Sequence, residues 1–234
     1  MDLRVESLWR YPVKSLGGEQ LTSADVVDTG IVGDRSFGLR DVETGLILTA
    51  RRQPELLFAS AQWHDGSVRV TLPDGSITDS DADLSSWLGK PVELVSGAQG
   101  GGRYENPMDV ENDADWVEWD GPPDSFHDSG RTRASLVSTA TLRDWDPIRF
   151  RKNIICAGSG EDDLIGAAVQ IGSAEFDVTK RVGRCVMVTR PQPGVDRDLD
   201  VLKTINRERN SELGIGMTVT THGTINVGDA VMTT

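Results

Sequence analysis

The chain has 234 residues, of which 37% are hydrophobic and 26% charged, a balance typical of an ordered globular protein with one large domain or two small ones. Its formal net charge of −13 argues against a nucleic-acid surface, which needs clustered cations. No apolar run approaches the roughly 18 residues of a membrane span, and the first residues do not resemble a signal peptide. We therefore expect a cytoplasmic protein with neither a membrane nor a nucleic-acid partner.

The choice of charged residues is uneven. The sequence contains 25 Asp but 12 Glu, and 19 Arg but only five Lys. An acidic surface with few lysines is typical of proteins from salt-loving organisms, in which dense carboxylates keep the fold hydrated. We predict a halophilic origin, with an acidic mesophilic protein as the alternative. The two cysteines, Cys156 and Cys185, have no metal-ligand spacing, which favours a reduced protein.

Residues 1–95 contain short strand patterns separated by turns. Strands are predicted over residues 3–9, 21–27, 35–40 and 68–72. The turn Pro73-Asp74-Gly75 follows the last of them. A short helix is predicted over Asp81–Leu88, because acidic residues occupy its first turn and Gly89 follows it. Many short strands at this spacing suggest a small β-barrel or sandwich.

Residues 96–123 have a different character. A triple glycine at 100–102 precedes an acidic segment, residues 109–120, that carries Trp116 and Trp119. Neither a helical nor a strand period is evident, so we predict a flexible loop or linker whose tryptophans dock it onto the body. A loop of this length is also a candidate lid.

Residues 124–234 are predicted to form a second β-rich unit. A helix is expected over Ser135–Trp145, with Leu136 and Leu142 facing inward, and another over Asp200–Arg209. Strands are expected over residues 153–157, 168–172, 174–179 and 223–231, and in the apolar stretch that begins at Cys185. The predicted fold is mainly β with some helix (α+β), with domains over 1–95 and 124–234 and a loop or linker over 96–123.

The segment from Lys180 to Arg190 places one thiol among four cations. Lys180, Arg181, Arg184 and Arg190 flank Cys185, and nearby positive charge favours the thiolate, which attacks electrophiles or binds soft metals. The alternative is that Cys185 is a small buried hydrophobe, as many free cysteines are. The three histidines, His64, His127 and His222, have no partner pattern and are predicted to be surface or turn residues.

Three further cation clusters stand out in this lysine-poor chain. They are Lys14-Ser15, the turn arginine Arg35, and Arg149 to Asn153 directly before a predicted strand. Lysine charge, serine hydroxyl and arginine forks together suit a phosphate. The alternative for each cluster alone is a salt bridge to one of the many carboxylates. No hydrolase, zinc-protease or nucleotide-loop motif is present.

Seven motifs follow one another along nearly the whole chain: Leu8–Ser15, Gly30–Arg35, Thr49–Pro54, Phe126–Asp128, Arg149–Asn153, Gly183–Cys185 and Gly223–Asp229. In this order the chain resembles the MOSC proteins that carry a MOSC N-terminal β-barrel domain, among them the mitochondrial amidoxime-reducing component and its bacterial counterparts. The resemblance implies an N-terminal β-barrel-like domain packed on a C-terminal MOSC β-barrel.

The resemblance also implies a molybdenum cofactor, a molybdenum–molybdopterin, with no haem, flavin or iron–sulfur cluster in this chain. Cys185 would be the catalytic residue and metal ligand. The residues that would bind the cofactor are Lys14, Ser15 and Arg35 at its phosphate, Arg151 and Asn153 at the pterin, Arg184 beside the metal ligand, and Asp128.

The activity implied by the resemblance is reduction of small N-hydroxylated (N-oxygenated) compounds, with electrons from a separate flavin or iron–sulfur protein. A second interpretation is sulfur transfer with a persulfide on Cys185, because MOSC domains also occur in molybdenum cofactor sulfurases. A third is a cofactor carrier without turnover. The chain departs from the family at Lys152, where relatives usually have proline, and at residues 188–194, which lack the usual Thr-Thr-Val-Asp-Pro.

Overall fold

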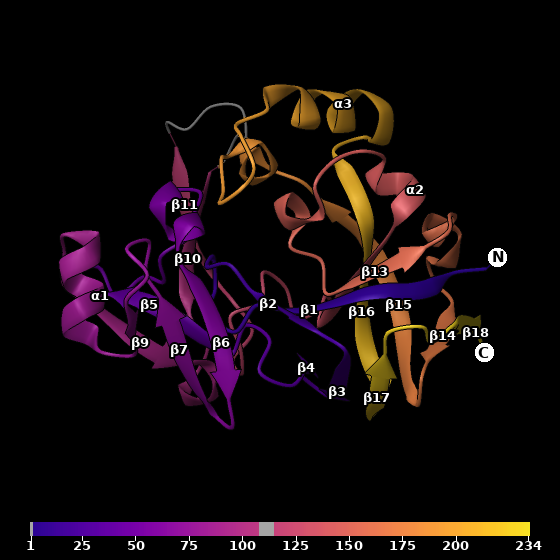
Figure 1. Cartoon of the computed structure of the whole chain (residues 1–234), viewed down its shortest axis with the longest axis horizontal. Helices are drawn as coiled ribbons and strands as arrows, with labels where there is room; N and C mark the ends of the chain where they lie inside the picture. Colours follow the sequence, from indigo (N-terminus) through magenta and orange to yellow (C-terminus); the bar gives the residue numbers. More distant parts are fainter. Residues whose placement is uncertain (1, 108–114) are drawn as a thin grey trace.

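The computed structural model of the chain describes residues 2–107 and 115–234. Strands dominate these residues and three α-helices accompany them, which confirms the prediction of a mainly β fold with some helix. Figure 1 shows two groups of elements side by side, with β5 to β11 on the left and β12 to β18 on the right. Both chain termini lie at the right-hand edge of that view.

The largest sheet is a curled sheet of eight strands. In spatial order its strands are β18 (Val231–Thr233), β14 (Ala168–Ile171), β15 (Ala174–Gly183), β16 (Glu212–Thr221), β12 (Ala134–Ser138), β13 (Ile154–Ala157), β1 (Arg4–Arg10) and β2 (Glu19–Leu21). All neighbouring pairs are antiparallel except β12 and β13, which run parallel.

Four smaller sheets complete the described part of the chain. They are β17 (Gly223–Asn226) with β3 (Ser23–Val27) and β4 (Gly30–Ile31); β5 (Phe37–Asp41) with β9 (Val92–Ser96); β6 (Ser60–His64) with β7 (Ser67–Thr71) and β8 (Ile77–Thr78); and β10 (Arg103–Pro107) with β11 (Trp116–Asp120).

The beginning of the chain pairs with its end. Strand β1 pairs with β13, so that Leu8 lies opposite Ile154, and β3 pairs with β17. The apolar side chains of the first strands are therefore buried in one core with Phe176 and Ile215. A second apolar core belongs to the left-hand group of strands and includes Leu56. The loops that follow β1 and β4 lie between these two cores, which hold them in position from either side.

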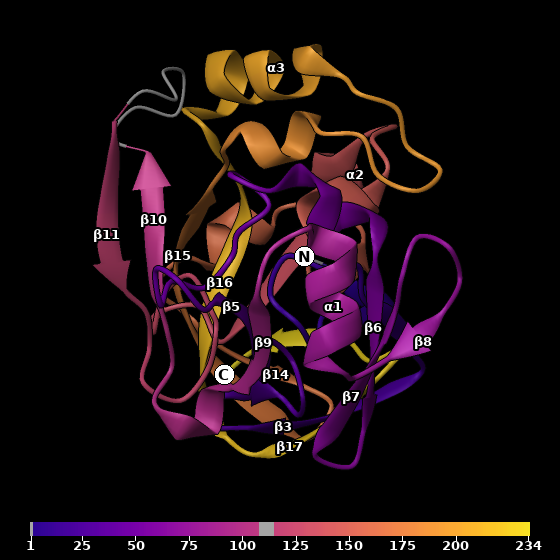
Figure 2. The same cartoon turned by 90° about the vertical axis from the view of Figure 1, so that its left-hand side faces the viewer.

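Two predicted helices are present, the first with its predicted limits and the second beginning one residue before the predicted Asp200. Helix α1 covers Asp81–Leu88 and ends at Gly89, whose φ of 67° needs a left-handed backbone conformation that glycine adopts easily. Helix α3 covers Leu199–Arg209, and the Asp198 side chain accepts a hydrogen bond at its first turn. Figure 2 shows α1 on the face toward the viewer and α3 across the top of the molecule.

The helix predicted over Ser135–Trp145 is wrong in its first half. Residues Ala134–Ser138 form β12, and α2 covers only Thr139–Leu142. All five residues of β12 are buried because the strand lies inside the large sheet between β13 and β16. A strand buried on both faces does not alternate, so its sequence resembles a helix start. The Ser138 side chain then accepts a hydrogen bond from the Thr141 amide and caps α2.

The strand predicted from Cys185 onward is also wrong. Strand β15 ends at Gly183, and a 3₁₀ turn covers Val186–Thr189 after Cys185. The Thr189 hydroxyl closes this turn by donating to the Val186 carbonyl at 2.7 Å. The apolar residue Val188 is buried under α3 rather than in a sheet. The other 3₁₀ turns cover Pro54–Phe58, Gly97–Gln99, Pro147–Phe150 and Glu161–Leu164.

The segment 96–123 contains more regular structure than predicted. Strands β10 and β11 pair as an antiparallel ladder, in which Tyr104 lies opposite Trp119. Their rings stack with centroids 5.3 Å apart, and the Arg52 guanidinium lies 4.2 Å from the centroid of the Trp116 ring. Docking by the two tryptophans is confirmed, and this cross-strand pairing explains the strands. Residues 108–114 of the predicted lid lie outside the described residues.

Strand β16, ten residues long, was not predicted from the sequence, although it pairs with both β12 and β15 and so holds the large sheet together. None of the helices within 2–107 and 115–234 has the length and apolar character needed to cross a membrane.

Candidate functional site

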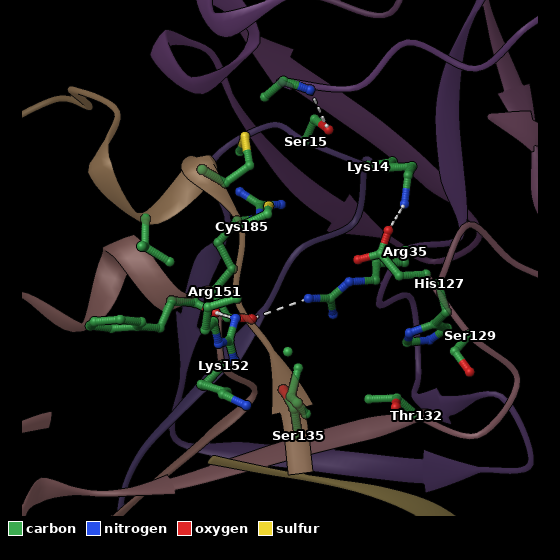
Figure 3. Close-up of a pocket in the computed structure, with 18 of the residues that line it drawn as sticks. Lys14, Ser15, Arg35, His127, Ser129, Thr132, Ser135, Arg151, Lys152 and Cys185 are labelled. Atoms are coloured by element: carbon green, nitrogen blue, oxygen red, sulfur yellow. Dashed lines mark hydrogen bonds and ion pairs between the residues drawn. The ribbon is translucent and has the colours of Figure 1, made fainter. Parts of the chain in front are cut away.

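A cavity of about 350 Å³ lies where the loops after β1 and β4 meet the large sheet. Figure 3 shows side chains from distant parts of the chain pointing toward this space. The structure brings all eight sequence-predicted site residues to its wall: Lys14, Ser15, Arg35, Asp128, Arg151, Asn153, Arg184 and Cys185. What each of them binds stays a prediction.

The wall of this cavity is strongly cationic. Among the described residues that line it, the basic side chains are Lys14, Lys152, Lys180, Arg35, Arg51, Arg149, Arg151 and Arg184, eight in all, whereas Asp128 is the one carboxylate. Three of the five lysines in the sequence are in this set. Because the whole chain has a net charge of −13, the concentration of cations here is the reverse of its general balance.

Lys14 and Asp128 form an ion pair on the cavity wall. The Lys14 ammonium donates to the Asp128 carboxylate at 2.9 Å and to the Phe126 carbonyl at 3.0 Å. Desolvation alone would raise the pKa of Asp128, but the charges of Lys14 and Arg51 hold it well below its usual range. Asp128 is therefore ionised, and its side chain is 72% exposed while that of Lys14 is 7% exposed.

Ser15 lies next to this pair in a left-handed backbone conformation, with a φ of 69°. Its hydroxyl oxygen accepts a hydrogen bond from the Ala50 amide at 3.0 Å. This bond ties the first cation cluster to the loop that carries Arg51, so that both reach the cavity together.

Arg35 and Arg151 both contact the Tyr11 ring, and a hydrogen bond connects the two residues. Arg35 pairs with the buried carboxylate of Asp34 and donates to the Arg151 carbonyl at 3.1 Å. Both guanidinium groups lie over the Tyr11 ring, at 5.4 Å and 4.4 Å from its centroid. Burial raises the pKa of Tyr11 to about 12 although the two arginines oppose it, so this ring stays neutral.

Several arginines of the wall are held by backbone carbonyls instead of carboxylates. Arg149 donates to the Val188 carbonyl at 3.3 Å, Arg151 to that of Leu16, and Arg184 to that of Leu213 at 3.0 Å. A carbonyl satisfies the guanidinium protons and fixes their direction, but it carries no net charge. The positive charge of these side chains is therefore not cancelled by a partner.

Cys185 is half-buried and its thiol faces a cation that the sequence argument did not select. Arg51 donates through Nε to the Cys185 sulfur at 3.4 Å. Of the four cations predicted to surround Cys185, Lys180 and Arg184 line the cavity, whereas Arg181 forms an ion pair with Asp162 at 3.5 Å. Arg51 belongs to the motif Thr49–Pro54, which was the available signal.

Asn153 is used by the scaffold as well as by the cavity wall. Its side-chain oxygen accepts from the Ser135 hydroxyl at 3.0 Å, and its side-chain amide donates to the Trp9 carbonyl at 3.3 Å. These bonds connect three adjacent strands, β12, β13 and β1, beneath the cavity. Asn153 therefore connects these strands directly below the cavity.

Two further residues of the wall were missed or misplaced from the sequence. His127 was predicted to be a surface or turn residue, but it is buried, and its Nε2 lies 3.1 Å from the Thr29 carbonyl, to which it can only donate. Burial and then Arg35 lower the pKa of His127 to about 4, so it is neutral at pH 7. Lys152 is 1% exposed, and its amine has no hydrogen-bond partner among the described residues.

The second cysteine has a different environment. Cys156 is fully buried in the apolar core on β13, and burial raises its pKa to about 12. Both cysteines are free thiols. A neutral thiol among apolar side chains is a poor nucleophile and a poor metal ligand, so Cys156 is unsuited to either role.

Comparison with known proteins gives two family matches. The model described as "MOSC N-terminal beta barrel domain" matches residues 2–104, and the model described as "MOSC domain" matches residues 129–232. Together they account for most of the chain, including every residue of the cavity wall except two residues between the matches, His127 and Asp128.

Among curated proteins, the chain is 24% identical to "Molybdenum cofactor sulfurase 2" of Aedes aegypti over 93% of its own length, and 22% identical to "Molybdenum cofactor sulfurase" of Danio rerio over 97%. It spans only 30% and 34% of those two proteins. Among solved structures, the YUAD protein from Bacillus subtilis has the same fold, with a TM-score of 0.52, 14% identity, and coverage of 99% of this chain and 94% of that one.

Proposed function

Because the chain belongs to the MOSC domain proteins that also carry a MOSC N-terminal β-barrel domain, we propose that its cavity binds a molybdenum–pterin cofactor. The observation that carries the proposal is the grouping of eight cations and one carboxylate around a half-buried thiol in an acidic chain. A phosphate-bearing pterin is an anion, and a soft metal binds a thiolate. The names of the two molybdenum cofactor sulfurases that the chain resembles refer to the same cofactor.

Cys185 is the residue we assign to the metal. It lines the cavity, and the neighbouring Arg51 guanidinium donates to its sulfur at 3.4 Å. Cys156 is unsuitable because it is buried among apolar side chains. The carbonyl-bound arginines Arg149, Arg151 and Arg184 add positive charge that draws an anionic ligand into the cavity.

Lys14, Ser15 and Arg35 still have protons to give to a phosphate. Lys14 makes two hydrogen bonds with an ammonium group that has three protons. Ser15 uses its oxygen as an acceptor, which leaves the hydroxyl proton for a ligand. Arg35 has a fork of five N–H groups, and its bonds to Asp34 and Arg151 use one N–H on each of its two terminal nitrogens. The set fits a phosphate without loss of its present contacts.

The activity we propose is reduction of N-hydroxylated compounds. A bound molybdenum–pterin supplies a centre that exchanges an oxygen atom and two electrons with the substrate. Converting R–NH–OH to R–NH₂ and water takes two electrons and two protons, and the electrons come from a separate flavin or iron–sulfur protein. The chain itself binds and orients the cofactor through Cys185 and the cationic wall of the cavity.

The test is to purify the chain from a host that makes the cofactor and to measure molybdenum, tungsten and pterin. Reduction of a simple N-hydroxylated amidine by reduced viologen is then followed, with the cofactor-free protein as control. We expect about one molybdenum per chain and activity that depends on it. Protein that contains neither metal nor pterin after such expression would refute the proposal.

Sulfur transfer is the second candidate function, and the similarity to two proteins named molybdenum cofactor sulfurases favours it. In that case Cys185 carries a persulfide, and mass spectrometry of the isolated protein would find an added mass of one sulfur on the peptide that contains Cys185. A cofactor carrier without turnover predicts tightly bound molybdenum with neither persulfide nor reductase activity. Metal content and peptide mass, measured on the same preparation, separate the three functions.

A further inference from the structure

Lys152 lies at one end of the cavity with its amine unsatisfied. It follows the turn Pro147–Phe150 and precedes β13, between Arg151 and Asn153. The residue is 1% exposed and lines the cavity, yet its amine has no hydrogen-bond partner among the described residues. In Figure 3, Lys152 and Ser135 lie at the end of the cavity opposite Ser15 and Cys185.

A glycine of β16 leaves the space that this side chain occupies. Gly214 has a φ of 68°, and a Cβ added there would come within 2.8 Å of both Cε and Nζ of Lys152. Any larger residue at position 214 would therefore collide with the amine. Because the side chain is buried, the amine has little rotamer freedom left to lose when a ligand binds to it.

The charges around Lys152 do not replace a hydrogen-bond partner. Arg184, which follows β15, and Arg35, which follows β4, repel a proton on the amine, whereas Glu161 and Asp162 of the turn Glu161–Leu164 attract it. Burial and then Arg184 lower the pKa of Lys152 well below its usual value. A buried ammonium without a partner is strongly unfavourable, which favours the neutral amine.

Lys14, the other fully enclosed lysine of this wall, shows the contrast. Its ammonium is already held by the Asp128 carboxylate and the Phe126 carbonyl. It is an ordinary buried cation, whereas Lys152 lacks what such a cation needs. An anionic oxygen placed at the Lys152 end of the cavity would supply it, and the amine would then take up a proton.

We propose that Lys152 is an anion-binding residue of the cavity, which takes up one proton when a phosphate or carboxylate group of a ligand contacts its amine. The inference rests on the proposed function only for the identity of the ligand. The anionic group belongs either to the cofactor or to the substrate, and these two sources are separated below.

The first experiment uses inorganic phosphate on the full chain prepared without cofactor. Calorimetric titrations in buffers of different ionisation enthalpy, at pH 7.5, give the number of protons taken up per phosphate bound. Wild-type protein is expected to take up nearly one proton more than Lys152→Met or Lys152→Gln, and to bind phosphate at least tenfold more tightly. Lys203→Met, at a lysine of α3 that is 69% exposed, is the matched control and should behave as wild type.

A purely structural role for Lys152 predicts other results. The Met and Gln variants would then unfold at lower temperature than wild type, while phosphate affinity and proton uptake stay unchanged, and that result would overturn the proposal. If the Met variant does not fold, the Gln variant and the wild-type proton count still decide. Uptake of less than about 0.2 proton by wild type would contradict the proposal without any variant.

A second experiment identifies the source of the anion. If the cofactor provides it, the Lys152→Met protein loses pterin on dialysis while the wild type retains it. If the substrate provides it, the variant keeps pterin, and its KM rises tenfold for anionic N-hydroxylated substrates but not for neutral ones. Equal pterin retention together with unchanged KM values would remove Lys152 from the site.

The two proposals fail separately. Wild-type protein without molybdenum or pterin, but with phosphate-linked proton uptake that Lys152→Met abolishes, would refute the proposed function and keep the role of Lys152. Normal cofactor loading in wild type and variant, with no proton uptake in either, would keep the proposed function and refute the role of Lys152.

Discussion

The cavity wall and the outer surface of this chain carry opposite charge, and they satisfy their cations differently. On the surface, basic side chains pair with carboxylates, as Lys203 does with Asp200 at 3.0 Å and Arg103 does with Glu118. In the cavity, Arg149, Arg151 and Arg184 are bonded to backbone carbonyls instead. Surface pairs cancel charge, whereas the wall keeps its charge for a ligand.

This difference gives a reason why three of the five lysines line one cavity. An acidic chain has carboxylates available near almost any position, so a cation that must stay uncompensated has to be kept away from them. Asp128 is the one acidic side chain that lines the cavity within the described residues. It lies beside Lys14, whose ammonium it keeps charged although burial lowers the pKa of that lysine. The predictions below compare inside and outside at matched residues.

The largest effect is expected at the two cysteines. Cys185→Ser should reduce the molybdenum content of the purified protein by more than tenfold, because the hydroxyl is a poor ligand for a soft metal. Cys156→Ser should retain the metal, since Cys156 is enclosed by the core. Elemental analysis of both variants, with circular dichroism to confirm folding, is the measurement. Full metal occupancy in the Cys185 variant would place the metal elsewhere.

The next effect concerns two arginines. Arg35→Ala should destabilise the cofactor-free fold by about 3–5 kcal/mol, because it leaves the buried Asp34 carboxylate without its partner. Arg69→Ala, at an exposed position of β7, should change stability by no more than about 0.5 kcal/mol. Urea unfolding of both variants measures the difference. An Arg35→Ala protein as stable as wild type would mean that the Tyr11 amide, from which Asp34 already accepts a hydrogen bond at 2.7 Å, is a sufficient partner for that carboxylate.

The elements that could be predicted from the sequence are those with local signals. Helix α1 ends at Gly89 and α3 begins at Asp198, so both carry their own caps. Strand β12 and the long strand β16 were misread or missed because they are buried inside the sheet, where pairing with distant strands decides. A local pattern contains no information on such pairing.

The candidate site divides in the same way. The motifs predicted that Lys14, Arg35 and Cys185 would meet, and the structure brings them to one cavity. Arg51 was not selected, because its contact with Cys185 joins residues 134 positions apart. Lys152 could be located from the sequence, but its lack of a hydrogen-bond partner among the described residues is a property of the packed structure. Composition showed that lysine is rare, and only the fold shows where it is concentrated.

A buried and an exposed histidine should respond differently to pH. The pKa of His127 is lowered to about 4 in the folded protein, below its ordinary value near 6.5, so above pH 6.5 it has no effect on stability. As the pH falls from 6.5 to 4, the unfolded chain takes up the proton first, and stability should fall by about 3 kcal/mol. His127→Gln should remove this loss.

His222 is the control for that measurement, because it lies on the surface with its side chain 57% exposed, 2.8 Å from Asp28. His222→Gln should leave the decline between pH 6.5 and 4 in place. Urea unfolding at several pH values is sufficient. A decline that survives in the His127 variant would have to come from other groups, and the assignment of the neutral, buried imidazole would then be wrong.

The smallest effect is expected at the outer surface. With a net charge of −13, mutual repulsion of exposed carboxylates loosens the fold at low ionic strength, and salt screens it. Raising potassium chloride from 10 to 300 mM should stabilise the cofactor-free protein by about 1 kcal/mol, or a few degrees in Tm.

Chloride could also enter the cationic cavity and stabilise the protein there, so the surface contribution needs its own variant. Asp79 and Asp144 are exposed, and replacing both by Asn should reduce the salt dependence without touching the cavity. An unchanged slope in that double variant would assign the salt effect to the cavity, whereas a Tm that does not respond to salt at all would contradict a halophilic origin.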